Sequence, residues 1–376
     1  MRVYIDENAG RGGIALLPDK ELASLRSRFL RFAQEARGRS PLYERLSLAV
    51  AEDDEIVSLL ATAAERQRRP NLLFAAVHDL LLGGADHELA TYYPSVGGDR
   101  EPEGRTFPVF RSFLQDFNSE VIQRLTTYAT QTNEPGRCAA LRAGLGRLAT
   151  HADRPVALLE LGASAGLLLH LDRYRYRYGE VEVGPQASEV TISPELRGTV
   201  PRDLTLPTIA QRIGIDLDPL DPSDPAAASW LKACVWPEDI DRLYRLEAAL
   251  TIASANDDVR FVTGDLVEML EPAVRDVDPD LLVCVMHSAA FAYLDEGTFH
   301  RVEETLDQLG AQRDVVRLAF EGPFLEPFVS HARLAFGPEL DMETFLLGLT
   351  TWRHGRRTDE LLARAQAHGA WLDWLG

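Results

Sequence analysis

The sequence has little cysteine and almost no lysine. Its 376 residues contain three cysteines, Cys138, Cys234 and Cys284, which lie far apart and have no nearby cysteine or histidine partner. This spacing argues against a zinc motif or a disulfide framework and suits a reducing compartment. Lysine occurs twice, as Lys20 and Lys232, and arginine supplies the other 37 of the 39 basic residues, which we interpret as a bias of the source genome.

Long apolar runs are also missing. No run reaches the roughly 18 residues that a membrane-spanning helix needs, and residues 1–7 lack the apolar stretch of a signal peptide. We therefore expect a cytoplasmic protein without a membrane segment. The net charge of −19 repels phosphate backbones, so a nucleic-acid partner is disfavoured. The length favours two domains, and the 45% hydrophobic content is that of a globular protein.

The first part of the chain has the apolar periodicity of helices. Leu22, Leu25, Phe29 and Phe32 recur at helical spacing, and Ser40-Pro41 is typical of a helix start. Further helices are predicted over residues 53–64, 72–82, 107–130 and 139–149. We expect an all-helical N-terminal cap domain over about residues 1–150, without strands.

The second part alternates apolar runs with helical stretches. Strands are predicted over residues 156–160, 212–217, 259–263, 281–286 and 315–320, with helices over 226–232, 238–255 and 298–309. This alternation predicts an α/β domain over residues 151–376, with a Rossmann-like, mainly parallel sheet covered by helices on both faces. Residues 172–210 are predicted to form a β excursion. At the end we expect a strand at 345–352, a helix at 359–367 and an edge strand at 370–375.

The strand at 156–160 leads into a turn of small residues. Gly162 to Gly166 spell Gly-Ala-Ser-Ala-Gly, and an apolar helix is expected from Leu167. A strand that ends in glycines and leads into a helix brings backbone N–H groups close to a ligand in many α/β proteins. Together with Glu160, the turn resembles the first motif of S-adenosylmethionine-dependent methyltransferases. Its Gly-x-Ser-x-Gly pattern also resembles the nucleophile elbow of α/β-hydrolases.

The methyltransferase resemblance implies further residues, which follow in the expected order. The second strand should end in an acid for the ribose hydroxyls, and Asp216 stands there; a carboxylate accepts two hydrogen bonds from a vicinal diol. The third should end in Gly-Asp and an apolar residue beside the adenine, which Asp265 and Leu266 match. The implied cofactor site for S-adenosylmethionine consists of Glu160, Gly162, Ala163, Gly166, Asp216, Asp265 and Leu266.

The fourth strand should open near the transferable methyl group, where His287 and Ser288 stand. We take His287 as a candidate general base, because its unperturbed pKa lies near neutrality, and Ser288 as a substrate contact. A hydrogen-bonded structural histidine is the alternative. No metal is required by this chemistry.

Two features depart from the methyltransferase pattern. About 50 residues separate Gly166 from Asp216, whereas roughly 20 is usual in a dinucleotide-binding unit. Ser164 replaces the middle glycine of the usual motif, which is tolerable if its backbone angles are ordinary. A nicotinamide-binding fold is less favoured because Gly-x-Gly-x-x-Gly is absent. The hydrolase alternative needs Ser164 as nucleophile, but its strand is the first of the predicted sheet, whereas an elbow normally follows several strands.

The chain also resembles a bacterial family known only as a domain of unknown function. The resemblance rests on Glu-Leu-Gly-Ala-Ser-Ala-Gly-Leu followed by Leu-Asp-Arg-Tyr-Arg-Tyr, and it extends over nearly the whole chain. Further shared stretches are Arg39-Ser40-Pro41-Leu42-Tyr43, Thr132-Asn133-Glu134 with Arg137, Gly214-Ile215-Asp216, Trp230-Leu231 with Trp236-Pro237, and His368-Gly369. The resemblance implies one unit of helical cap plus Rossmann-like domain and no established reaction.

Three other groups of residues are candidates. Asn133, Glu134 and Arg137 lie at a helix break and are candidate substrate contacts, with helix capping and ion pairing as the alternative. His78 and Tyr92-Tyr93-Pro94 are candidate lid residues, with packing as the alternative. The Arg-Tyr alternation at 173–179 is interpreted as a strand with tyrosines on one face, rather than as a nucleic-acid surface.

Taken together, the sequence predicts a methyltransferase that transfers a methyl group from S-adenosylmethionine to a small molecule, bound between the helical cap and the Rossmann-like domain. Two alternatives stay open. One is a Rossmann-like binding or regulatory protein without chemistry, and the other is a serine hydrolase that uses Ser164.

Overall fold

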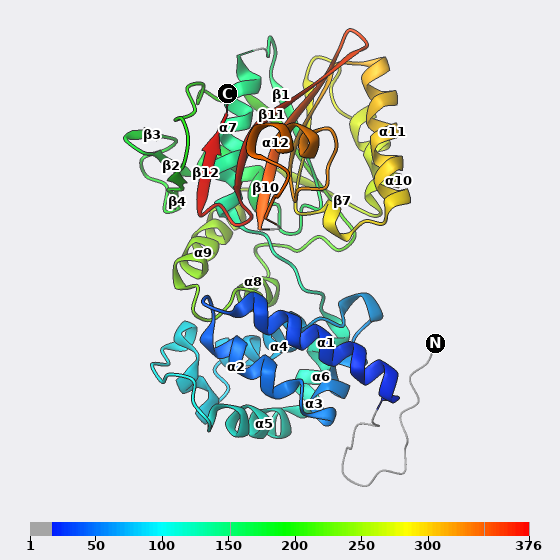
Figure 1. Ribbon diagram of the computed structural model, residues 1–376. Coiled ribbons are helices and arrows are strands. Elements are labelled where there is room, and N and C mark those ends of the chain that lie inside the picture. The colour runs from blue at the N-terminus through cyan, green and yellow to red at the C-terminus, as the bar shows by residue number, and fades with distance from the viewer. Residues whose placement is uncertain (1–16, 151, 342, 376) are drawn as a thin grey trace. The chain divides into compact units, whose positions relative to one another are not determined.

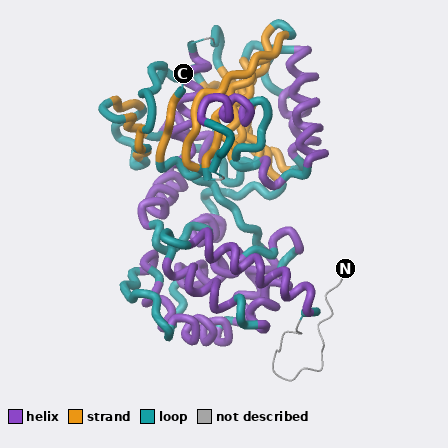
Figure 2. Tube along the Cα trace, viewed as in Figure 1, coloured by secondary structure: helices purple, strands orange, loops and turns teal. Residues whose placement is uncertain are grey.

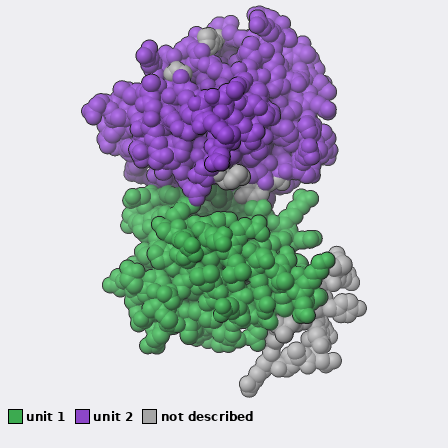
Figure 3. Space-filling model, in the orientation of Figure 1, with its two compact units in different colours: residues 1–132, 225–244 green, residues 133–224, 245–376 purple. Residues whose placement is uncertain are grey.

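The computed structural model describes residues 17–150, 152–341 and 343–375. The chain forms two compact units, which are coloured separately in Figure 3. Unit 1 comprises residues 1–132 and 225–244, and unit 2 comprises residues 133–224 and 245–376.

Unit 1 is helical, as predicted, and its described residues include no strand. The predicted apolar stripe of the first helix is buried, and the Ser40 side chain accepts a hydrogen bond from the Tyr43 N–H at the start of the second. The α-helices of this unit are α1 (Asp19–Ala36), α2 (Pro41–Val50), α3 (Asp54–Leu59), α4 (Pro70–Leu82), α5 (Thr106–Asp116), α6 (Asn118–Thr127) and α8 (Pro225–Ala233). Short 3-10 helices occupy Leu60–Thr62, Glu65–Gln67, Glu88–Tyr92 and Pro94–Val96.

The single long helix predicted over residues 107–130 is wrong, because two helices stand in its place. The chain leaves the helical conformation at Phe117, where φ is −114° and ψ is 29°. The Phe117 ring stacks on Phe113 at a centroid distance of 4.6 Å. Both helices are amphipathic, so their apolar spacing is also typical of one continuous helix.

Unit 2 is built on a nine-stranded sheet in the order β5-β12-β11-β10-β9-β8-β1-β6-β7. Figure 1 labels most of these strands, and Figure 2 distinguishes strands from helices by colour. Strands β9, β8, β1, β6 and β7 are parallel to one another, and β10 to β12 continue the sheet in antiparallel fashion. The bounds are β1 (Val156–Leu161), β5 (Glu195–Leu196), β6 (Ile209–Asp216), β7 (Val259–Thr263), β8 (Leu282–Ser288), β9 (Val315–Glu321), β10 (Thr344–Arg353), β11 (Arg356–Gln366) and β12 (Trp371–Trp374).

Helices cover both faces of this sheet. Apolar residues of α10 (Leu266–Arg275), α11 (Glu296–Gln312) and α12 (Phe328–Phe336) form one core with the strand residues on one face. In Figure 1, α10 and α11 lie side by side, and their residues are in contact. Helix α7 (Cys138–Ala149) packs on the other face, where Gly144 lies against Leu318. Helix α9 (Ile240–Ser254) spans the boundary between the ranges of the two units. The α/β class is therefore confirmed.

The helix predicted at residues 359–367 is wrong, because β11 occupies this position. Its residues favour a helix locally, but β11 pairs with β10 across a tight turn in which Gly355 has a φ of 73°. This pairing with a neighbouring strand outweighs local propensity. Helix α10, which the sequence analysis did not predict, follows β7.

The apolar helix expected from Leu167 is also wrong. A seven-residue 3-10 helix, Leu167–Arg173, takes its place and is kinked at His170. Three of its carbonyl groups accept hydrogen bonds from side chains: Leu167 from Tyr174, Leu171 from Tyr176, and Leu169 from Arg212. Side chains thus occupy carbonyls that a regular α-helix would use.

The Arg-Tyr segment belongs to the predicted β excursion, which forms a small sheet in the order β3-β2-β4. Its strands are β2 (Arg175–Tyr178), β3 (Val181–Val183) and β4 (Thr191–Ile192). The Tyr176 and Tyr178 side chains are fully buried, whereas Arg177 is exposed. The interpretation of a strand with tyrosines on one face is confirmed.

Candidate functional site

The candidate site lies at the carboxyl end of β1, the central parallel strand of unit 2. The chain runs outward from β1 to β6 and β7, and then crosses back to β8 on the other side of β1. In α/β proteins, ligands bind outside the carboxyl ends of the strands where the strand order reverses in this way. The Gly162–Gly166 turn stands at this position.

The backbone of the turn is unusual. Gly162, Ser164 and Gly166 all have positive φ, at 74°, 52° and 68°. The condition under which Ser164 is a tolerable replacement for glycine, ordinary backbone angles, is not met. The left-handed region costs a residue with a Cβ atom roughly 1–2 kcal/mol. Ser164 is thus a strained residue in a position that favours glycine, and such strain is concentrated at functional sites.

Two side chains hold the turn. The Asn133 Nδ2 donates to the Ala163 carbonyl at 3.2 Å, and its Oδ1 accepts from the Leu167 N–H at 2.9 Å. The Asp216 Oδ2 accepts from the Ser164 N–H at 2.8 Å. Asn133, predicted as a substrate contact, therefore binds backbone groups on both sides of the turn, and Asp216 places a carboxylate against it.

Glu160 supplies a buried carboxyl group just before the turn. Its side chain is 1% exposed, and its Oε2 has no hydrogen-bond partner among the described residues. Burial raises the pKa of Glu160 well above its ordinary value; Asp216 raises it further, and Arg137 lowers it. A buried carboxyl oxygen without a partner is costly unless a ligand completes its hydrogen bonding.

Glu134 and Arg137 frame this region from the chain preceding β1. The Glu134 Oε1 accepts from the Gly136 N–H at 2.8 Å and from the Arg245 Nε at 3.2 Å. The buried Arg137 donates to the carbonyls of Ala367 at 3.1 Å and Ser288 at 3.3 Å. These contacts connect the residues before α7 with α9, with the last residue of β8 and with the residue after β11.

His287 forms a buried pair with Glu321, a residue that the sequence analysis missed. The side chains are 0% and 1% exposed, and the His287 Nδ1 lies 2.8 Å from the Glu321 Oε1. The same oxygen accepts from the N–H groups of Ala290 at 3.1 Å and Phe291 at 3.3 Å. Burial lowers the pKa of His287, and Glu321 partly opposes this change. The neutral ring thus carries its proton on Nδ1, and the buried Nε2 has no partner among the described residues.

A signal for Glu321 exists in the sequence. Like Glu160, it ends an apolar strand and comes shortly before a glycine, here Gly322. The resemblance to methyltransferases implies site residues at the ends of the first four strands only, and Glu321 stands at the end of the fifth.

The strand register divides the predicted residues between two faces of the sheet. Glu160 is aligned with Gly214 and Met286, so Asp216 and Ser288, two residues further along their strands, lie on the face of Glu160. His287 is aligned with Leu161 and therefore lies on the opposite face. The structure thus brings together Glu160, Asp216 and Ser288 and separates His287 from them.

Of the remaining predicted residues, Asp265 and Leu266 follow the carboxyl end of β7, and Ser288 is the last residue of β8. Asp265 caps α10, and its Oδ1 accepts from the Val267 N–H at 2.9 Å. Leu266 is half-buried and packs against the sheet core. The Ser288 Oγ is buried and has no partner among the described residues.

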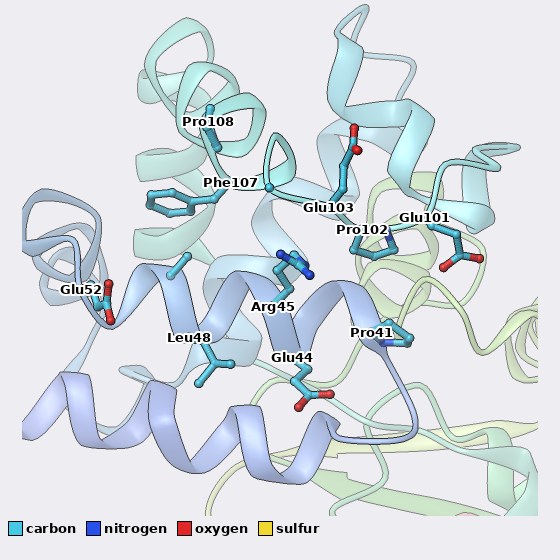
Figure 4. Close-up of a pocket in the computed structure, with 12 residues that line it drawn as sticks. Pro41, Glu44, Arg45, Leu48, Glu52, Glu101, Pro102, Glu103, Phe107 and Pro108 are labelled. Atoms are coloured by element: carbon cyan, nitrogen blue, oxygen red, sulfur yellow. The ribbon is translucent and has the colours of Figure 1, made fainter.

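Unit 1 contains a separate groove of about 810 Å³, shown in Figure 4, between α2 and residues 101–108. Four glutamates and one arginine line it: Glu44, Glu52, Glu101, Glu103 and Arg45. None of the residues that the sequence analysis assigned to the site line this groove. No group of three or more His, Cys, Asp or Glu side chains in the described chain is arranged to hold a metal ion.

A protein-family model matches nearly the whole chain. The model of a family described as "Uncharacterized protein conserved in bacteria (DUF2332)" covers residues 26–374. The chain belongs to this family. The match spans both units and confirms the resemblance to a bacterial family of unknown function. No curated protein matches the chain. Among the described helices, none combines the length and the apolar character that a membrane span requires.

Proposed function

We propose that the site at the end of β1 binds S-adenosylmethionine and that the protein transfers the methyl group to a small molecule. One observation carries the proposal: Glu160 and Asp216 place two carboxyl groups beside the glycine turn, on the same face of the sheet. S-adenosylmethionine has a sulfonium group and a net positive charge. Carboxylates attract such a ligand, whereas they repel the pyrophosphate of a dinucleotide. Burial raises the pKa of Glu160, and a bound cation would favour its ionised form.

The segment after the turn supports the same choice. Pyrophosphate-binding folds place the ligand at the N-terminus of an α-helix, where N–H groups and the helix dipole hold negative charge. Here the turn leads into a kinked 3-10 helix of seven residues, Leu167–Arg173. A short, kinked 3-10 helix provides little of the partial positive charge of an α-helix N-terminus, so an anionic cofactor is disfavoured.

The order of the parallel strands supports a Rossmann-like assignment. The order β7-β6-β1-β8-β9 has the same pattern as the 3-2-1-4-5 order of doubly wound folds, with the site at the reversal point. The antiparallel strands β10 to β12 extend the sheet beyond this common part.

Each cofactor residue then has a role that its chemistry supports. Asp216 uses Oδ2 to hold the Ser164 N–H, and its remaining lone pairs suit the ribose hydroxyls. Asp265 and Leu266 suit the adenine amino group and ring. The unpartnered Oε2 of Glu160 fits a cationic or hydrogen-bonding group of the ligand. When bound, S-adenosylmethionine supplies an electrophilic methyl group.

In this proposal Ser288 contacts the acceptor, and His287 is a positioning residue. The Ser288 Oγ is buried, lacks a partner among the described residues and lies on the face of Glu160. His287 lies on the other face, and its partner Glu321 holds the N–H groups of Ala290 and Phe291. Ala290 in turn lies against the turn, since a Cβ on Gly162 would stand 2.9 Å from the Ala290 Cβ. Alignment of the acceptor, more than proton transfer, supplies the catalysis.

Calorimetric titration of the full-length protein tests the proposal. We expect S-adenosylmethionine and S-adenosylhomocysteine to bind, NAD not to bind, and Asp216→Ala to reduce the affinity at least tenfold. Asp280→Ala serves as the control, because it removes an exposed carboxylate just before the amino end of β8. Binding of NAD, or of neither sulfur compound, would contradict the proposal. Binding without methyl transfer to any compound of an acceptor screen would favour the non-catalytic alternative.

A further inference from the structure

A second reactive arrangement lies within unit 1, away from the residues assigned to methyl transfer. His78, on α4, is fully buried and has a partner at each ring nitrogen. Its Nδ1 lies 3.1 Å from the carbonyl oxygen of Ala233, at the end of α8, and its Nε2 lies 2.6 Å from the Ser95 Oγ.

These contacts fix the position of the protons. A carbonyl oxygen only accepts, so the Nδ1 of the ring must carry a proton and donate it to Ala233. Burial lowers the pKa of His78 to about 4, so the ring is neutral at pH 7 and Nε2 keeps its lone pair. The Ser95 hydroxyl must then donate to Nε2. A serine that donates to a histidine whose other nitrogen is oriented by a third group has the geometry of an activated nucleophile.

The segment that carries Ser95 is held by local contacts and is partly exposed. Ser95 stands in the 3-10 turn Pro94–Val96, which ends at Gly97 with a φ of 87°. The Gly98 N–H donates to the Tyr93 carbonyl at 3.0 Å, and a Cβ on Gly98 would stand 2.4 Å from the Ala90 carbonyl oxygen. Ser95 itself is half-buried, and both Pro94 and Gly97 are exposed.

The environment of His78 also suits proton transfer. The Tyr93 ring lies 5.5 Å from the imidazole, centroid to centroid, where it can stabilise a positive charge on the ring. Asp79, the next residue, accepts from Arg124 at 2.7 Å and from Ser229 at 2.6 Å. These contacts fix the helix turn on which His78 stands.

We propose that Ser95 is a nucleophile that accepts acyl groups from esters, with His78 as its general base and the Ala233 carbonyl as the group that orients the base. In the reaction, the Ser95 hydroxyl proton moves to the His78 Nε2 while the Oγ forms a bond to the acyl carbon. The bond from that carbon to the alkoxy oxygen breaks, and the leaving alcohol takes the proton from Nε2. Water attacks the acyl-serine by the same proton route and restores the enzyme.

A fluorophosphonate probe tests this proposal on the full-length protein. The Oγ forms a bond to phosphorus, the phosphorus–fluorine bond breaks, and the hydroxyl proton passes to His78. We expect one label per chain, mapped to Ser95 by peptide mass spectrometry and lost in Ser95→Ala. His78→Gln should slow labelling by about 10²–10⁴-fold, the usual contribution of a general base.

The control is Ser27→Ala. Ser27 is also a serine of unit 1 with a side-chain hydrogen bond, but its acceptor is the carbonyl oxygen of Ala23, at 2.9 Å, and no histidine is involved. This variant should label at the wild-type rate. Since Ser95→Ala removes one half-buried hydroxyl, its circular dichroism spectrum should match the wild type, which separates loss of the nucleophile from loss of the fold. Absence of labelling, or a label that maps to Ser164 or another residue, would overturn the proposal.

Discussion

Adding one methyl group to the glycine turn should disturb the site far more than the backbone angle alone explains. Gly162 and Gly355 both lie in unit 2, and their φ angles are 74° and 73°. A Cβ on Gly355 meets nothing within 4 Å, whereas a Cβ on Gly162 stands 2.9 Å from the Ala290 Cβ. The two Gly→Ala variants therefore share the conformational cost and differ in the steric one.

The magnitudes follow from these contacts. In each variant, an alanine must adopt the left-handed conformation, which lowers the free energy of unfolding by roughly 1–2 kcal/mol. Gly162→Ala adds an overpacking cost of about 1–3 kcal/mol, because Ala290 is held in place by its N–H bond to Glu321 and moves away with difficulty. We expect a loss in the free energy of unfolding of about 1–2 kcal/mol for Gly355→Ala and about 2–5 kcal/mol for Gly162→Ala.

Urea denaturation measures both losses, and peptide-resolved hydrogen exchange of β1 assigns the transition to unit 2. The double variant Gly162→Ala with Ala290→Gly removes the clash. It should recover most of the stability difference between Gly162→Ala and Gly355→Ala, and the double-mutant cycle measures the coupling between the two positions. Equal losses in the two single variants would refute the described packing of the turn against Ala290.

Three further outcomes are expected. Long-range nitrogen NMR should find His287 neutral at pH 7 with its proton on Nδ1, because Glu321 accepts there; a proton on Nε2 would contradict the described pair. Asn133→Ala should lower the free energy of unfolding of unit 2 by about 2–4 kcal/mol in urea denaturation, because two backbone groups lose their hydrogen-bond partner. A loss below about 0.5 kcal/mol, the lower end for one hydrogen bond, would show that the two Asn133 hydrogen bonds do not stabilise the turn. His78 titrates at about 4 in the fold and at 6.5 in the unfolded chain. As the pH falls, the unfolded state therefore binds this proton at a higher pH than the folded state does. The free energy of unfolding should fall by about 3 kcal/mol as the pH drops from 6.5 to 4. His78→Gln should remove this part of the pH dependence; an unchanged pH profile would contradict the burial of a neutral ring.

The parallel strands could be predicted because each is a short apolar run between helices. The turn at Gly162–Gly166 and the acid at Asp216 could be placed for the same reason, since both stand where such a run ends. β11 could not be predicted, because its residues favour a helix and its pairing with β10 depends on a neighbouring strand. The 3-10 helix after the turn depends on tyrosine hydroxyls that reach back from β2 and the residue before it.

The arrangement of the site depended on register, which the sequence does not reveal. His287 follows an apolar strand, as a catalytic residue of the predicted fold would, but alignment with Leu161 directs it to the face opposite Glu160. The role of Asn133 required the turn to be within reach of the chain before α7. The strain at Ser164 could not be inferred either, because its identity suggests an ordinary conformation.

The most direct test of the central claim is hydrogen exchange of the full-length protein with and without S-adenosylhomocysteine. If the turn is the ligand site, protection should increase in peptides that cover residues 156–171 and 209–220 and remain unchanged in the β10–β11 hairpin. Protection confined to unit 1, or no change at saturating ligand, would contradict the assignment of the glycine turn and Asp216 as the binding site.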